Sequence, residues 1–248
     1  MAVLVTRPQP DNDTTAAALR ARGYDVVAAP MLRFEPLTLS DAPETKYAGV
    51  IVTSAAAIRA LEGQAALTGL RPLRLYAVGA HTAEAAREAG FSNVVSADGD
   101  AAALRELILG GSRKRAKVAD APLLYLAGAD LARDLASELG ERGFTVAVQT
   151  TYRMTPATVL PPAAADAVGA GRIEAVLHYS RRSARAFAAA ARASGVEVSA
   201  LAILQCCLSE AIAMVIRDGG ADHVAVARTP DENALFETLD RAIRARSE

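Results

Sequence analysis

Residues 49–61 read GVIVTSAAAIRAL, and this segment gives the clearest indication of the fold class. Gly49–Val52 is a short apolar run rich in β-branched residues, which is typical of a strand buried on both faces of a parallel sheet. The hydroxyl residues Thr53 and Ser54 follow directly, and Ala55–Leu61 is rich in good helix formers. The stretch therefore predicts a strand, a hydroxyl-bearing turn and a helix, which is the building unit of an α/β protein.

Similar units recur along the chain. They are found at Val3–Thr6, Leu75–Ala86, Leu123–Leu139, Ala175–Ala191 and Ala202–Ala213. In such a unit the turn lies at the carboxyl end of the strand and the amino end of the helix, where free N–H groups and the helix dipole favour anions. Because several of these turns carry hydroxyl side chains, we expect the protein to hold a polyanionic ligand.

The composition is that of a globular protein with ample core. Of the 248 residues, 52% are hydrophobic and 22% are charged. Apolar runs stay below the roughly 18–20 residues that a transmembrane helix needs. The start, MAVLVTRPQ, lacks a basic segment followed by a signal-like apolar core. We therefore expect a cytoplasmic protein without a membrane partner.

Several other classes of partner are disfavoured. A net charge of −1 and the absence of tryptophan argue against a nucleic-acid partner. The chain contains neither a GxGxxG nor a GxxxxGK[ST] motif, so a nucleotide cofactor has no support in the sequence. The three histidines lack the spacing of metal ligands, so we expect no metal site. Cys206 and Cys207 are adjacent in an apolar run, and we predict buried small residues rather than a redox pair.

Two proline-rich stretches, residues 30–47 and 154–162, interrupt the alternation of strands and helices. The piece before the first stretch is too small to hold a core alone. The last piece would form a fuller sheet if the two strands of the first piece were added to it. We therefore predict a discontinuous first α/β domain (1–35 with 157–248) and a second α/β domain (36–156), with a cleft between them. The alternative is two sequential domains that divide near residue 120.

A set of short motifs occurs in one order over nearly the whole chain. They are VLVTRP (3–8), PMLRFEPL (30–37), VIVTSAAAIRAL (50–61), YAVGAHTAEAAREAGF (76–91), TTYRMTP (150–156), LHYSRRSARAF (177–187), CLSEAIA (207–213) and VAVARTPDENAL (224–235). Together they resemble the uroporphyrinogen-III synthase family. The resemblance implies an α/β fold of two flavodoxin-like domains, with parallel sheets flanked by helices and a two-stranded linker.

The resemblance also implies an activity. In that family hydroxymethylbilane, a linear tetrapyrrole with eight carboxylates, loses water and closes to uroporphyrinogen III with its terminal pyrrole ring inverted. This is a step of tetrapyrrole biosynthesis. The family suggests a monomer that uses no cofactor or metal, and transient contact with hydroxymethylbilane synthase is left open.

Tyr152 is the candidate catalytic residue, because it matches the tyrosine of the family's linker motif. Hydroxide is a poor leaving group, so a hydrogen-bond donor placed near it should help its departure. A phenol is a good donor and stays protonated at pH 7. The alternative is that Tyr152 packs its ring at the domain junction and donates one structural hydrogen bond.

The turns supply the candidate substrate-binding residues. Hydroxyl residues at or just after strand ends are Thr6, Thr53, Ser54, Thr82, Ser180 and Ser209. Gly79 would let a carboxylate approach the backbone closely. Helix N-capping favours the same residue types, and the two roles can coexist. The turn at 205–209 lacks the glycine of the turn at 77–79, which leaves close carboxylate approach open there.

Three arginines complete the predicted binding site. Arg7, Arg181 and Arg182 directly follow strand ends, where a helix should begin. A cation there opposes the helix dipole, and a bound carboxylate would remove this conflict. Exposed arginines without a ligand are the alternative. The other functions that we keep open are a two-lobed binding protein for a small polycarboxylate ligand and a family member that has lost catalysis.

Overall fold

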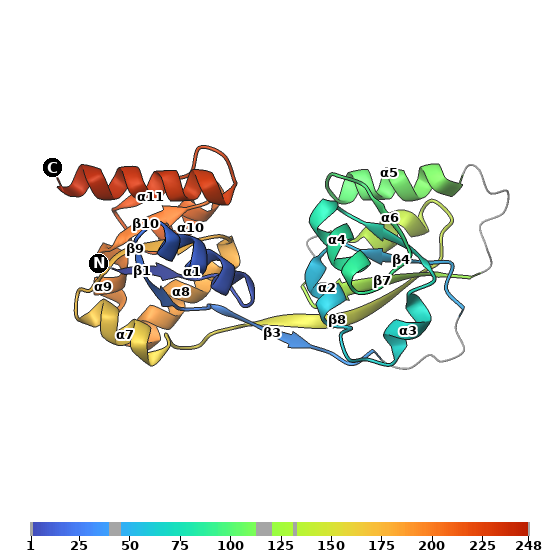
Figure 1. Ribbon diagram of the computed structural model, residues 1–248, viewed down its shortest axis with the longest axis horizontal. Coiled ribbons are helices and arrows are strands. Elements are labelled where there is room, and N and C mark those ends of the chain that lie inside the picture. Colours follow the sequence, from blue (N-terminus) through green and yellow to red (C-terminus); the bar gives the residue numbers. More distant parts are fainter. Residues whose placement is uncertain (1, 40–45, 113–120, 131–132, 248) are drawn as a thin grey trace. The chain divides into compact units, whose positions relative to one another are not determined.

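The computed structural model describes residues 2–39, 46–112, 121–130 and 133–247. The chain divides into two compact units (Figure 1). Unit 1 comprises Met1–Phe34 and Thr155–Glu248, and unit 2 comprises Glu35–Met154. Both are α/β structures built on a parallel sheet with flanking helices, as the sequence predicts. In the described part of the chain, we find no helix with the length and apolar character needed to cross a membrane.

Unit 1 has a five-stranded sheet in which each neighbouring pair of strands runs parallel. Its strands are β1 (Ala2–Val5), β2 (Asp25–Ala28), β9 (Ile173–His178), β10 (Leu204–Cys207) and β11 (Val224–Val226). They lie in the order β2-β1-β9-β10-β11. Counted along the chain of this unit, the order is 2-1-3-4-5, which is the flavodoxin-like arrangement.

Helices surround this sheet. They are α1 (Asp11–Ala21), α7 (Pro162–Gly169), α8 (Arg181–Ala193), α9 (Glu197–Ala202), α10 (Glu210–Asp218) and α11 (Glu232–Ser247). Because side chains alternate along a strand, Val3 and Val5 of β1 face the same layer. There they join one buried cluster with Leu19 of α1 and with Leu235 and Phe236 of α11.

Unit 2 contains most of a six-stranded sheet in the order β3-β8-β7-β4-β5-β6. Its strands are β3 (Leu32–Pro36), β4 (Gly49–Val52), β5 (Arg74–Ala77), β6 (Asn93–Ser96), β7 (Leu123–Gly128) and β8 (Val146–Pro156). The pairs among β4 to β8 are parallel. By contrast, two hydrogen bonds show that β3 and β8 run antiparallel. Leu37 N donates to Thr151 O and Ala157 N donates to Met31 O, so the numbers rise along one strand as they fall along the other.

The helices of unit 2 cover both faces of its sheet. They are α2 (Ala55–Arg59), α3 (Ala66–Leu70), α4 (Ala80–Glu88), α5 (Ala101–Ser112) and α6 (Leu135–Gly140). Val50 and Val52 of β4 pack with α2, α3 and α4 on one face. Ile51, between them, packs with α5 and α6 on the other face. Gly49–Val52 is therefore buried on both faces, as its unbroken apolar run predicts.

The two units repeat one pattern of strands. In unit 2 the pair β7-β8 takes the place that β1-β2 holds in unit 1, and β4-β5-β6 takes the place of β9-β10-β11. The sequence RGYDVV at 22–27 recurs as RGFTVA at 142–147. The strand register identifies equivalent positions in the two units. Val5 pairs with Leu177 in unit 1, and Tyr125 pairs with Ile51 in unit 2, so Val5 corresponds to Tyr125 and Leu177 corresponds to Ile51.

The proline-rich stretches contribute two paired strands, as the predicted two-stranded linker requires. β3 occupies part of the first, and β8 continues to Pro156 inside the second, before α7 begins at Pro162. The proline at position 156 ends the strand, since proline has no N–H to donate to a ladder. Both crossings between the units are thus paired strands.

Candidate active site

The predicted site residues of unit 2 lie at the carboxyl edge of its parallel sheet. Thr53 and Ser54 follow β4 directly, and Gly79 follows β5. Ser54 caps α2, since its hydroxyl oxygen accepts a hydrogen bond from Ala56 N at 3.2 Å. The capping role predicted as an alternative is therefore confirmed for Ser54, while its hydroxyl hydrogen can still be donated to a ligand.

Gly79 and Thr82 belong to the amino end of α4. Gly79 is the N-cap residue, and a Cβ added to it would meet no described atom within 4 Å. A group that approaches Gly79 from the side of its missing Cβ therefore meets no described atom, and the first N–H groups of α4 have no partner within the helix. Thr82 lies one turn further on and is 6% exposed, so its hydroxyl is less accessible than the backbone at Gly79.

A β-bulge sets the direction of Tyr152. The pairing of β7 with β8 shifts between two neighbouring residues, so that Ala127 pairs with Thr150 and Gly128 pairs with Tyr152. Thr151 is the extra residue; it is fully buried, and its hydroxyl donates to Ala127 O at 3.2 Å. Bulges re-aim side chains next to functional sites. Here the bulge brings the Tyr152 side chain over β7.

The Tyr152 ring rests against the backbone of Gly128. A Cβ added to Gly128 would lie 2.7 Å from Cζ and 2.9 Å from the hydroxyl oxygen of Tyr152. The ring also packs on the cluster that includes Val52 and Leu126, and Tyr152 as a whole stays partly exposed. The Tyr152 ring therefore packs within unit 2, which places the phenol at the carboxyl edge of the sheet. Its catalytic role stays a prediction.

Tyr125 is a further hydroxyl at this edge, and the sequence interpretation did not single it out. It belongs to β7 and is 2% exposed, and its hydroxyl lies 3.1 Å from Oγ1 of Thr53. Burial is the largest cause and raises the pKa of Tyr125, whereas the hydrogen bond with Thr53 opposes this shift. A tyrosine inside the apolar run LLYLAG (123–128) was the signal in the sequence.

In unit 1, Thr6 and Arg7 have partners within the protein. Thr6 is fully buried, and its hydroxyl donates to Leu177 O at 2.7 Å. Arg7 donates to Glu232 Oε1 at 3.0 Å and to Asp11 Oδ2 at 3.2 Å. Its guanidinium carbon also lies 4.6 Å from the centre of the Tyr179 ring. Thr6 thus connects the end of β1 to β9, and Arg7 connects it to α1 and α11, so both residues have a structural role.

Ser180, Arg181 and Arg182 form the start of α8, where the sequence predicted a helix to begin. Ser180 is the N-cap, and its hydroxyl oxygen accepts a hydrogen bond from Ser183 N at 3.0 Å. Arg181 and Arg182 are the first two helical residues; Arg181 is exposed and Arg182 is partly exposed. Both cations therefore lie at the positive end of the helix dipole, as predicted.

Ser209 is the N-cap residue of α10. Among the described residues, no backbone N–H donates a capping hydrogen bond to its side chain. The structure thus does not give Ser209 the capping bond that Ser54 and Ser180 have. Its hydroxyl lies at the carboxyl end of β10, in the position that Gly79 holds after β5.

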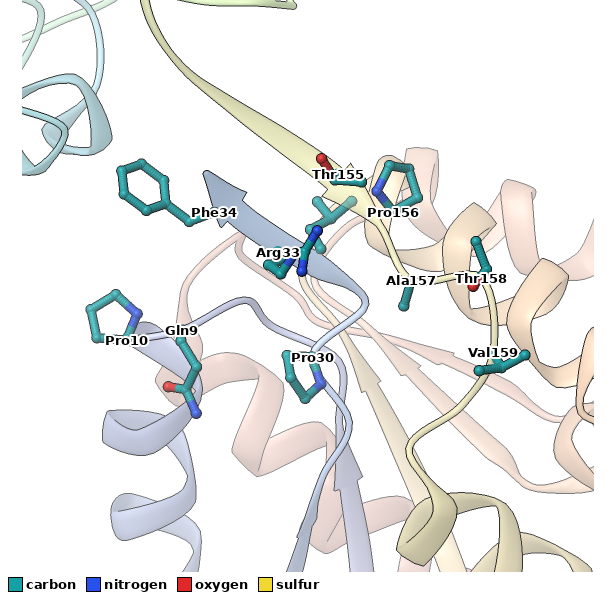
Figure 2. Close-up of a pocket in the computed structure, with 11 residues that line it drawn as sticks. Gln9, Pro10, Pro30, Arg33, Phe34, Thr155, Pro156, Ala157, Thr158 and Val159 are labelled. Carbon is teal, nitrogen blue, oxygen red and sulfur yellow. The ribbon is translucent and has the colours of Figure 1, made fainter. Parts of the chain in front are cut away.

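A cavity of about 760 Å³ opens in unit 1 beside the carboxyl ends of β1 and β2. Figure 2 shows Gln9 and Pro10 on one side and the segment 155–159 on the other. The lining residues are Gln9, Pro10, Pro30, Leu32, Arg33, Phe34, Thr155, Pro156, Ala157, Thr158 and Val159. Most of them are apolar, and Arg33 supplies a positive charge.

Comparisons with known proteins agree on one family. Residues 13–237 match the family model described as "Uroporphyrinogen-III synthase HemD". The fold resembles that of uroporphyrinogen-III synthetase from Helicobacter pylori, with a TM-score of 0.65, 16% identity and coverage of 98% of this chain and 99% of that one.

It also resembles a mutant uroporphyrinogen III synthase from the extremely thermophilic bacterium Thermus thermophilus, with a TM-score of 0.55, 17% identity and coverage of 99% of each chain. A comparison with curated proteins gives no significant match. At these identities the solved structures support the fold, and the family model carries the assignment. The chain belongs to the uroporphyrinogen-III synthase family.

Proposed function

We propose that this protein converts hydroxymethylbilane to uroporphyrinogen III, without a cofactor, in tetrapyrrole biosynthesis. Membership of the family, over residues 13–237, is the observation that carries the proposal. The reaction breaks the carbon–oxygen bond of the terminal hydroxymethyl group, releases water and closes the macrocycle with the last ring inverted.

In this proposal the Tyr152 phenol assists the departure of hydroxide. It donates its proton to the leaving oxygen, which departs as water, and the proton released when the new carbon–carbon bond forms restores the phenol. The bulge at Thr151 and the absence of a side chain at Gly128 hold the phenol in one place. Such fixed placement is a large part of catalysis when the intermediate can also close without ring inversion.

Groups that bind carboxylates lie at the carboxyl edge of each sheet. In unit 2 we assign them to the Thr53 and Ser54 hydroxyls and to the helix end at Gly79, with Thr82 behind it. In unit 1 we assign them to the start of α8, at Ser180, Arg181 and Arg182, and to Ser209 before α10. Helix N-termini and arginines both suit acetate and propionate groups. Thr6 and Arg7 are left out of this assignment, because their polar groups already bond within unit 1.

The test is to supply purified protein with freshly generated hydroxymethylbilane and to identify the porphyrinogen isomer that forms. Spontaneous closure gives the type I isomer, without ring inversion. Type III product that is absent from a protein-free control supports the proposal. If a folded sample gives type I alone at the spontaneous rate, the proposal is wrong, and bilane binding without turnover would then favour a binding protein.

The same assay tests Tyr152. Tyr152→Phe removes the donor and keeps the ring that packs on Gly128, so we expect turnover to fall about tenfold or more, which corresponds to about 1.4 kcal/mol. Unchanged turnover would remove Tyr152 from the mechanism.

We further propose that the protein acts in the cytoplasm as a monomer and that the two compact units are its domains. Sedimentation or light scattering at assay concentration tests the oligomeric state. A mass near twice the 25.8 kDa of one chain would contradict the proposed monomer.

A further inference from the structure

We propose that Tyr125 is a positioning residue that holds the Thr53 hydroxyl ready to donate to a substrate carboxylate. The inference rests on the proposed function, because it concerns how one of the assigned carboxylate-binding groups is kept in place. It adds a residue from inside the sheet to a site otherwise made of turns and helix ends.

The geometry gives the two hydroxyls different surroundings. Tyr125 is 2% exposed, whereas Thr53 is partly exposed at the end of β4. Their oxygen atoms are 3.1 Å apart, which is hydrogen-bond distance. Within the described part of the chain, Thr53 is the one hydrogen-bond partner of the Tyr125 hydroxyl. The buried phenol therefore contacts Thr53 and not the ligand, and it acts on the ligand only by orienting the Thr53 hydroxyl.

The direction of this hydrogen bond decides what Thr53 can do. A hydroxyl has one hydrogen to donate and two lone pairs that accept. If Tyr125 donates to Thr53, the Thr53 hydrogen is free to point outward to an anion. A phenol is much more acidic than an aliphatic alcohol and is therefore the better donor of the two. An incoming carboxylate, which accepts only, selects the same direction.

The repeat of the fold shows that this position does not need a phenol. Val5 of β1 is the equivalent of Tyr125 and is fully buried, and Tyr179 takes the place of Thr53. The strand of unit 1 that corresponds to β7 therefore packs with a valine at this position. Burying a hydroxyl without a hydrogen-bond partner is costly, so packing alone does not explain a tyrosine at position 125. Its contact with Thr53 supplies one.

The experiment compares Tyr125→Phe, Thr53→Val and the double variant in the formation of type III product. We expect each single change to raise KM about three- to tenfold, as loss of one hydrogen bond does, with kcat changed less. The double variant should then be no worse than Thr53→Val. In Thr53→Ser, which keeps a hydroxyl, Tyr125→Phe should still raise KM.

Tyr24→Phe is the matched control. It removes another phenol, which donates to Asp240 Oδ1 at 2.5 Å in unit 1, and it should leave KM unchanged. Thermal unfolding of each variant checks that it folds. An unchanged KM in Tyr125→Phe, or effects that add in the double variant, would overturn this inference while wild-type activity stands. Failure of the wild type to form type III product would overturn the proposed function and the inference with it.

Discussion

The ring of Tyr152 occupies the space that a side chain at Gly128 would fill, since a Cβ on Gly128 would lie 2.7 Å from Cζ of Tyr152. Real Cβ atoms do not come so close to a ring, so the space for the phenol exists because position 128 has no side chain. The neighbouring bulge at Thr151 turns Tyr152 toward that space. Two features of β7 and β8, the glycine at position 128 and the bulge at Thr151, thus determine where the proposed donor lies.

Gly128→Ala should therefore impair catalysis by displacing Tyr152. The new methyl group forces the phenol to move, and a displacement of about 1 Å can cost on the order of a hundredfold in rate. We expect kcat for type III product to fall at least about tenfold while the protein remains folded.

Gly69→Ala is the control for that change. Gly69 lies in α3 of the same unit, and a Cβ there would meet no described atom within 4 Å. Alanine is the better helix former, so this variant should be fully active and slightly more stable. Equal activity of Gly128→Ala and the wild type would show that the position of the phenol is unimportant.

Arg181 should show opposite effects on binding and stability. It is exposed in the first turn of α8, where a cation opposes the helix dipole. Arg181→Glu replaces it with a favourable charge, so we expect the free energy of unfolding to rise by a few tenths to about 1 kcal/mol. At the same time KM should increase, because a cation that faces the substrate carboxylates becomes an anion.

Steady-state kinetics and urea unfolding measure the two effects in one preparation. Arg185→Glu makes the same change of charge at an exposed position one turn further along α8, and it should alter KM less. An Arg181→Glu variant with unchanged KM would place Arg181 outside the binding site.

The framework of the fold was predictable because its signals are local. The apolar run at Gly49–Val52 and the alanine-rich segment after it formed a strand and a helix. Glycines at positions 90 and 143 end helical segments with φ of +93° and +87°, as residues without a side chain can. The short helices α3, α7 and α9 were not predicted, since none of them directly follows a strand in one of the predicted strand–turn–helix units, as α2 does.

The site was less predictable because its contacts join distant parts of the chain. Arg7 was a predicted ligand-binding cation, yet its partner Glu232 is 225 positions away. Thr53 and Tyr125 are 72 positions apart, and their contact follows from the pairing of β4 with β7. The bulge at Thr151 depends on the register of two strands. No short segment of the sequence contains a signal for any of these contacts.

The two cysteines should be unreactive in the folded protein. Both lie in β10 and are fully buried, in agreement with the sequence prediction. Burial raises the pKa of each thiol to about 12, so the reactive thiolate is scarce at neutral pH. A thiol-specific chromogenic reagent should modify both in denaturant and neither in buffer within minutes. Rapid modification in buffer would show that β10 is accessible.

His178 should make the stability of the protein depend on pH. It is fully buried, its Nε2 lies 2.8 Å from Gln205 Oε1, and its Nδ1 has no partner among the described residues. Gln205 uses its amide hydrogens on Ala200 O and Ile203 O, so its oxygen is the acceptor and His178 donates from Nε2. Burial of the ring, with an unpartnered Nδ1 that a proton would charge, keeps the imidazole in its neutral Nε2–H form.

Burial lowers the pKa of His178 from 6.5 to about 4, against a smaller opposing effect of Gln205. Between these values the unfolded chain binds a proton that the folded protein does not, so stability falls as the pH falls through this window. We expect the loss attributable to His178 to be about 2 kcal/mol between pH 7 and pH 5. Urea unfolding of the wild type and of His178→Gln, which keeps a donor for Gln205, measures it. The variant should lose less stability on acidification, and an identical loss in both proteins would assign the effect to other groups.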